Sequence, residues 1–160
     1  MSEPTAEYSP ASSHPLLRVV LDTNVYVSGL ILARGTPFQI LEAWRQQAYI
    51  LVTSELIIVE IERVLRYPRI RDRYGVTEAD SARLIASLRA DALIVAGIND
   101  IEPACSDPDD DKFLACALEA GADCIVTGDP DLLTLVSYAG IDILKPSEFL
   151  ARLNTPQDTQ

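Results

Sequence analysis

Short apolar runs rich in β-branched residues alternate with capped helical segments along most of the chain, and this alternation constrains the fold most strongly. Each apolar run is bounded by polar residues, as expected of a strand buried on both faces of a parallel sheet. The pattern predicts an α/β fold with a central, mostly parallel sheet and helices on both faces. The predicted strands are Leu17–Asn24, Tyr49–Ser54, Leu93–Gly97, Asp123–Asp129 and Ile141–Leu144.

The segments between these runs carry helix start and stop signals. Thr36 precedes a proline, Ser54 caps a second helix and Gly121 closes a later one, in the positions that such residues favour at helix ends. The predicted helices are Thr36–Ala48, Ser54–Tyr67, Thr77–Ala92, Pro108–Ala120, Pro130–Gly140 and Lys145–Leu153.

The chain of 160 residues has the length of one domain, which we place at residues 16–153. Residues 1–15 are polar and rich in proline and serine, without a basic or apolar leader region, and 154–160 are also polar. Both ends are therefore predicted to be disordered tails. No apolar run is long enough to cross a bilayer, so we expect a cytoplasmic protein without membrane contact.

The composition excludes several kinds of catalytic site. The single histidine, His14, lies in the predicted tail, which argues against histidine-based nucleophilic catalysis and histidine-ligated metals. Cys105, Cys116 and Cys124 are odd in number and show no paired spacing, so a disulfide framework or a zinc site is not expected. A metal ion here must be a hard cation held by oxygens, such as Mg²⁺, Mn²⁺ or Ca²⁺. The net charge of −11 argues against nucleic-acid binding through a broad basic face.

Two acids follow predicted strands. Asp22 ends the first strand and Asp129 ends a later one. In parallel α/β sheets the functional crevice lies at the carboxyl ends of the strands, so these side chains are predicted to face one crevice. The alternative, that each is a turn or capping residue, is common for a single Asp but explains two of them less well.

Further acids gather before the apolar helix that starts near Pro108. Asp107 can cap that helix, and Asp109 can pair with Lys112 and stay solvated. Asp110 and Asp111 continue the apolar face of the helix, so they are predicted to point toward the crevice. Like charges placed there repel unless a cation lies between them, which predicts that these surplus acids are metal ligands.

Glu60 lies on an apolar stripe of its helix that includes Leu56 and Val64. This placement predicts an additional carboxylate that reaches the crevice from another helix. The alternative is a residue at the rim of the core.

The segments "LDTNVYVSGL", "DPDDDKFLACALEAGAD" and "IVTGDPDLL", together with an inward Glu after the second strand, resemble the PIN domain family. They are most similar to the bacterial PIN proteins classed as toxin components of toxin–antitoxin systems. The resemblance runs from Arg18 to Leu153 and implies a three-layer α/β/α sandwich.

The resemblance also implies an activity. Members of the family are Mg²⁺- or Mn²⁺-dependent ribonucleases whose acids lie at the strand ends. The positions that match the family's four acids, and so the predicted catalytic and metal-binding residues, are Asp22, Glu60, Asp111 and Asp129. Thr23 and Asn24 match polar residues that orient the first acid or a bound water, and Asp110 and Asp131 are predicted auxiliary ligands. An RNA substrate, a cognate antitoxin and a homodimer or higher homo-oligomer are the implied partners.

Such acids would act through one or two divalent ions, which lower the pKa of a bound water and stabilise the leaving oxygen of the phosphodiester. Arginines concentrate in one segment, at Arg66, Arg69, Arg71 and Arg73, interleaved with tyrosines. They are predicted RNA contacts, with a solvated loop between helices as the alternative.

Two other functions compete with the ribonuclease hypothesis. One is a regulatory or protein-binding module without nuclease activity, against which the intact set of acids argues. The other is phosphotransfer through an aspartyl phosphate. Phosphatases of this kind need a second Asp two residues after the first, and that position is Asn24.

Overall fold

The computed structural model describes residues 16–97 and 108–155, and their strands form one sheet. The order across the sheet is β3-β2-β1-β4-β6-β5, with β5 antiparallel to β6 and the other neighbours parallel. This confirms the predicted α/β fold with a mostly parallel sheet. The strands are β1 (Arg18–Leu21), β2 (Ile50–Ser54), β3 (Leu93–Val95), β4 (Cys124–Val126), β5 (Ser137–Tyr138) and β6 (Ile141–Leu144).

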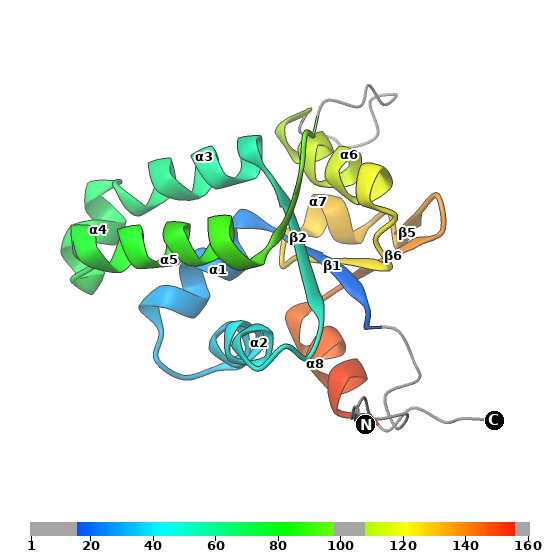
Figure 1. Ribbon diagram of the computed structural model, residues 1–160, viewed down its shortest axis with the longest axis horizontal. Coiled ribbons are helices and arrows are strands. Elements are labelled where there is room, and N and C mark those ends of the chain that lie inside the picture. The colour runs from blue at the N-terminus through cyan, green and yellow to red at the C-terminus, as the bar shows by residue number, and fades with distance from the viewer. Residues whose placement is uncertain (1–15, 98–107, 156–160) are drawn as a thin grey trace, which may run out of the picture.

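Helices cover both sides of the sheet (Figure 1). Helix α6 packs against β1, β2 and β4, whereas α2 and α8 pack against each other below the strands. Helices α3 and α5 run side by side toward α4. The helical elements are α1 (Thr23–Ile31), α2 (Thr36–Arg45), α3 (Glu55–Leu65), α4 (Pro68–Tyr74), α5 (Glu78–Asp91), the 3₁₀ turn η2 (Pro108–Asp110), α6 (Asp111–Ala120), α7 (Pro130–Leu133) and α8 (Pro146–Asn154).

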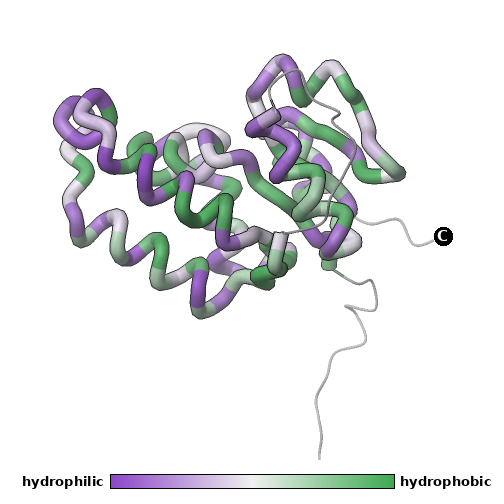
Figure 2. The backbone as a smooth tube through the Cα atoms, turned by 90° about the horizontal axis from the view of Figure 1, so that it is seen from above, coloured by the Kyte–Doolittle hydropathy of each residue, from purple (hydrophilic) through white to green (hydrophobic). Residues whose placement is uncertain are grey.

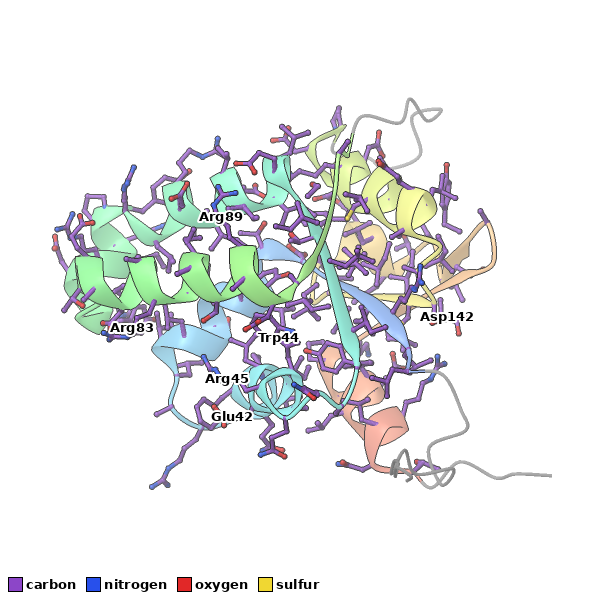
Figure 3. The ribbon with its side chains drawn as sticks, viewed as in Figure 1. Glu42, Trp44, Arg45, Arg83, Arg89 and Asp142 are labelled. Carbon is purple, nitrogen blue, oxygen red and sulfur yellow. The ribbon has the colours of Figure 1, made fainter. Side chains whose placement is uncertain are left out.

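The core lies between the sheet and these helices. The hydrophobic residues of the central strands are buried, and Figure 2 shows the α4 end of the molecule as mostly hydrophilic. Tyr49, before β2, meets Phe149 of α8 edge to face, with ring centroids 5.1 Å apart. Trp44 of α2, labelled in Figure 3, also belongs to the core. Burial of such large side chains, at roughly 1.5–3 kcal/mol each, fixes the helix layer on the sheet.

Helices α1 and α2 approach each other closely at Gly29. A Cβ atom at this position would lie 2.6 Å from Cδ1 of Leu41 and 2.9 Å from the carbonyl oxygen of Pro37. Only glycine fits this contact, which holds α1 against α2 and so sets the direction in which α1 leaves the end of β1.

Three segments differ from the sequence-based expectation. Helix α1 was not predicted, because Asp22 was interpreted as the end of a longer strand, whereas it caps a helix that begins at Thr23. The segment from Pro68 to Tyr74, interpreted in one alternative as a loop, is helix α4. The helix predicted for Pro130–Gly140 ends at Leu133.

The early end of α7 has a conformational cause. Val136 has a left-handed backbone with φ 62°, which a continuing helix does not allow. The next two residues form β5, which pairs with β6. Backbone pairing along the sheet therefore replaces the last turns of the predicted helix.

Several predictions fall partly or wholly outside the described residues. These are the tail at 1–15 with His14, residues 156–160, Cys105 and the capping role of Asp107. Asn154, assigned to the second tail, is the last residue of α8. Within residues 16–97 and 108–155, no helix has the length and apolar character needed to span a membrane.

Candidate metal centre

The carboxyl ends of β1 and β4 bring two of the predicted acids to one edge of the sheet. The strands are parallel neighbours, with Leu21 beside Val126, and the backbone N–H of Asp22 donates to the carbonyl of Val126 at 2.9 Å. Asp22 directly follows β1, and Asp129 follows β4 by three residues and caps α7. Thr127 links the two residues, because its hydroxyl contacts the Asp22 carboxylate and the backbone N–H of Asp129.

Asp22 is a buried acid with few compensating groups. Asp22 is only 5% exposed. The Thr127 hydroxyl donates to Oδ2 at 2.6 Å, and the Asn24 backbone N–H donates to Oδ1 at 3.3 Å. Burial raises the pKa of Asp22, the two hydrogen bonds lower it, and the charges of Asp129 and Glu60 raise it further. A cation beside this carboxylate would relieve the cost of keeping it ionised.

Thr127 connects the first and last acids of the crevice. Its buried hydroxyl donates to Asp22 and accepts from the backbone N–H of Asp129 at 2.9 Å. The Asp129 carboxylate in turn accepts from the backbone N–H of Asp131 at 2.9 Å. Sequence reasoning missed Thr127. The sequence does contain a signal for it. A Thr that directly follows a strand and precedes an acid by two residues can accept a hydrogen bond from the backbone N–H of that acid.

Three carboxylates come together closely enough to hold one ion. Asp110, Asp129 and Asp131 offer oxygens that all lie within 4.8 Å of one another. Asp110 is buried at the end of η2, Asp129 is half-buried and Asp131 is exposed. An oxygen-only donor set of this charge fits a hard divalent cation such as Mg²⁺, Mn²⁺ or Ca²⁺. Asp110 and Asp131, predicted as auxiliary ligands, are thus central members of this group.

The neighbours of Asp110 are arranged differently. Asp111 is the first residue of α6 and is half-buried. Within the described ranges it is not part of a group of three acids that could share an ion. Asp109 is exposed, as expected. A 3₁₀ turn ends at Asp110 and α6 begins at Asp111, whereas the prediction assumed regular helix from Pro108.

Glu60 reaches the crevice from α3 and is held there by neighbouring side chains. The Thr23 hydroxyl donates to Oε1 at 2.5 Å, and Nζ of Lys112 lies 3.1 Å from the same oxygen. Oε2 lies 3.7 Å from Arg63. Thr23, predicted to orient the first acid or a water, therefore binds Glu60, whereas the backbone of Asn24 binds Asp22.

The prediction that Glu60 lies on a buried apolar stripe was partly wrong. The buried residues of α3 are Ile57, Ile58, Ile61 and Leu65. Leu56 of the predicted stripe is 55% exposed, whereas Val64 is partly buried against the core. Glu60 lies at the edge of the buried face, and its side chain is 20% exposed. Its position is set by contacts with Thr23 and Lys112 and not by burial in an apolar face.

Lys112 has a different partner from the predicted one. It was expected to pair with the Asp109 carboxylate on the solvated side of the helix. Its ammonium instead donates to the backbone carbonyl of Asp109 at 2.6 Å and pairs with Glu60. Its side chain is 15% exposed, so this cation is mostly shielded from solvent.

The predicted RNA-contacting arginines lie on or beside α4, at the end of the α3–α5 pair (Figure 1). Arg71 lies 3.3 Å from Glu78, and Arg69 and Arg73 stack near Tyr67 and Tyr74. Their contact with RNA stays a prediction.

Arginines elsewhere are engaged by nearby acids. Arg89 forms a two-bond ion pair with Glu55, and Arg83 lies 2.7 Å from Asp80. Both arginines are labelled in Figure 3 on α5.

Comparisons with known proteins support a family assignment. A family model described as PIN domain matches residues 18–131. The uncharacterized protein MJ1680 of Methanocaldococcus jannaschii is 33% identical over 142 residues, covering 84% of this chain and 90% of the relative.

Two solved structures show the same fold. One is a chain of VapBC2 from Rickettsia felis, described as bound to a promoter DNA fragment. It has a TM-score of 0.53 and 12% identity, and the match covers 81% of this chain and 98% of that one. The other is VapC20 of Mycobacterium tuberculosis, described as a toxin that cleaves the sarcin–ricin loop. Its TM-score is 0.51 at 14% identity, and the match covers 78% of this chain and 98% of that one.

Proposed function

The chain belongs to the PIN domain family, and we propose that it is a metal-dependent endoribonuclease that hydrolyses phosphodiester bonds in RNA. The observation that carries the proposal is the grouping of Asp110, Asp129 and Asp131 within 4.8 Å, beside the buried Asp22. These acids come from separate parts of the chain and meet at the sheet edge where α/β enzymes bind their ligands.

The donor set fits Mg²⁺ or Mn²⁺. Asp22, Asp110, Asp129 and Asp131 are the residues that would hold the ion. When bound, a divalent ion would lower the pKa of water and neutralise charge that develops on the phosphate. The predictions from family resemblance for Asp111 and for Glu60 as direct ligands stay predictions.

The protein's own groups prepare the crevice for this chemistry. Thr127 orients the Asp22 carboxylate and holds the backbone of Asp129 through one hydroxyl. Thr23 and Lys112 orient the Glu60 carboxylate. Side chains held by such supporting hydrogen bonds lose little freedom when a ligand binds.

We further propose that the protein is the toxin of a toxin–antitoxin pair and acts in the cytoplasm. The support is the fold shared with VapC20, described as a toxin that cleaves the sarcin–ricin loop, and with a chain of VapBC2. A cognate antitoxin and a homo-oligomer are the expected partners.

The test is cleavage of structured and unstructured RNAs by the purified full chain, with Mn²⁺, with Mg²⁺ and with chelator. We expect discrete RNA fragments with metal and none with chelator. Asp22→Asn is the inactive control, and Asp91→Asn, which alters an exposed acid at the end of α5, is the matched active control. Intact RNA under all conditions, in a folded protein that fails to bind Mn²⁺, would support the regulatory-module alternative instead.

A further inference from the structure

Lys112 places a positive charge within the acidic crevice. Its Nζ lies 3.1 Å from Oε1 of Glu60, and it donates to the carbonyl of Asp109 at 2.6 Å. The ammonium also lies 4.8 Å from the ring centroid of Phe113. With a side chain only 15% exposed, this ion pair is shielded from water and salt far more than a surface pair.

The Glu60 carboxylate has protein groups beside both oxygens, close at Oε1 and looser at Oε2. Oε1 accepts from the Thr23 hydroxyl and faces Lys112, and Oε2 faces Arg63. The charge of Glu60 is therefore compensated without any added ion. A divalent cation bound directly to Oε1 would have to displace the ammonium of Lys112.

The opposite side of the crevice has a different chemistry. The hydrogen bonds that reach Asp22 and Asp129 come from neutral donors, namely the Thr127 hydroxyl and the backbone N–H groups of Asn24 and Asp131. These donors orient the carboxylates but carry no full charge. The position for an added cation is therefore on the side of Asp22 and Asp129, and not at Glu60.

A hollow of about 340 Å³ adjoins the ion pair of Glu60 and Lys112. Its described lining includes Arg63 and Pro108 besides these two residues. Lys112 thus borders a space large enough for a phosphate group, beside the Glu60 carboxylate. Its ammonium has three donors, and its two polar contacts, with Glu60 and Asp109, leave capacity for a ligand oxygen.

We propose that the centre binds one divalent cation, on the side of Asp22 and Asp129, and that the Lys112 ammonium takes the second cationic position. This inference rests on the proposed function and specifies its metal content. Lys112 would contact a substrate phosphate, in the place where a two-metal nuclease has its second ion. Glu60 then acts as a positioning residue that holds the ammonium.

The test is the number of Mn²⁺ ions bound per chain, measured by calorimetric titration of the full chain and by electron paramagnetic resonance. We expect one ion in the wild type. In Lys112→Met we expect a second, weaker ion, because Glu60 loses its internal cation. The double variant Lys112→Met/Glu60→Gln should return to one ion. Lys145→Met is the matched control, since Lys145 is exposed, and it should bind one ion.

A conservative variant separates charge from packing. Lys112→Arg keeps the positive charge and should keep one ion, whereas Lys112→Gln keeps most of the side-chain length and should gain the second. At low Mn²⁺ concentration, Lys112→Met should cleave RNA about 100-fold more slowly, as expected when one donor to a transition-state anion is removed. Millimolar Mn²⁺ should restore part of this loss.

The outcomes distinguish this inference from the proposed function. Two ions in the wild type, or one ion in folded Lys112→Met and Lys112→Gln, would overturn the role of Lys112 while leaving a metal-dependent nuclease. Absence of Mn²⁺ binding by the folded wild type would overturn both. Thermal unfolding of each variant in chelator shows whether the compared proteins are folded.

Discussion

The two sides of the crevice neutralise their acids in opposite ways. On the side built from β1 and β4, Asp22 and Asp129 are oriented by a hydroxyl and by backbone N–H groups. On the side built from α3 and α6, Glu60 is oriented by the Thr23 hydroxyl and also faces Lys112 and Arg63. Neutral donors fix geometry, whereas charged partners also cancel charge. We therefore propose that an external cation binds on the first side and not on the second.

The difference shows that acidity alone does not identify metal ligands. The sequence alone shows no difference in charge between these acids, and each lies near the same edge of the sheet. The groups that contact each carboxylate determine whether its negative charge is already neutralised or can still attract an ion. The predictions below vary those groups on one side at a time, beginning with the largest expected effect.

Asp22→Asn should have the largest effect on activity. It removes the buried carboxylate at the centre of the neutral-donor side, and we expect RNA cleavage to fall by about 1,000-fold, at the upper end of losses from removing one electrostatic contact. The measurement is the initial rate of cleavage at saturating Mn²⁺. A rate within a few-fold of the Asp91→Asn control would show that the ion is held elsewhere.

Asp110→Asn and Asp111→Asn separate two adjacent acids. Asp110 belongs to the close group with Asp129 and Asp131, and Asp111 does not. We expect Asp110→Asn to cost about 100-fold in cleavage rate, with a matching loss of Mn²⁺ affinity in a calorimetric titration. If the ion is held by the close group alone, Asp111→Asn should stay close to the wild type, whereas the family resemblance predicts a loss of cleavage. The reverse order of effects would restore Asp111 as the third acid and reassign Asp110 to a supporting role.

Thr127→Val and Thr23→Val remove one hydroxyl from each side. Thr127→Val leaves Asp22 and the Asp129 N–H without their shared partner, and we expect about 1–3 kcal/mol of destabilisation. Because Thr127 orients the proposed ligands, Mn²⁺ affinity should also fall by about tenfold. Thr23→Val leaves the pairing of Glu60 with Lys112 in place, so its Mn²⁺ affinity should change little. Equal losses of affinity in the two variants would contradict the difference between the sides.

The metal-free stability of the protein should depend on the ionisation of Asp22. Its pKa is raised in the folded state, chiefly by burial. Its contribution to stability is therefore fully present below the unfolded pKa of about 4 and is lost as pH rises through the folded pKa. In chelator, Asp22→Asn should become more stable than the wild type as pH rises from about 4 to about 7. Urea unfolding at several pH values tests this, and a constant difference would contradict it.

The smallest effect is expected from the arginines of α4. Arg69→Ala/Arg73→Ala should leave Mn²⁺ binding unchanged, because α4 lies at the far end of the α3–α5 pair (Figure 1). If these residues guide RNA, the slope of log RNA affinity against log salt concentration should become shallower, by the equivalent of about two phosphate contacts. An unchanged salt dependence would assign them to solvated surface only.

Much of the fold follows from patterns in the sequence. The strands β1, β2, β4 and β6 are short apolar runs, and their alternation with helices allows few arrangements other than a parallel sheet. Helix α5 starts directly after its cap Thr77, where the sequence predicts the helix to begin. The segment after Leu133 was not predictable in this way. Its sequence is compatible with a helix, and it forms a strand because it pairs with β6.

The candidate site could be predicted as a group of acids but not in its internal arrangement. Asp22 and Asp129 follow from the rule that parallel strands end at one edge. The choice between Asp110 and Asp111 depends on a 3₁₀ turn that no local signal marks. The pairing of Lys112 with Glu60 joins residues from two different helices, so helical spacing alone suggested the wrong partner.

The most direct test is the anomalous scattering of Mn²⁺ in crystals of the full chain grown with that ion. We predict one peak, coordinated by carboxylates among Asp22, Asp110, Asp129 and Asp131, with Lys112 still paired with Glu60. A peak bound to Glu60 in place of the ammonium would contradict this arrangement. Absence of any peak at these carboxylates would contradict the metal centre itself.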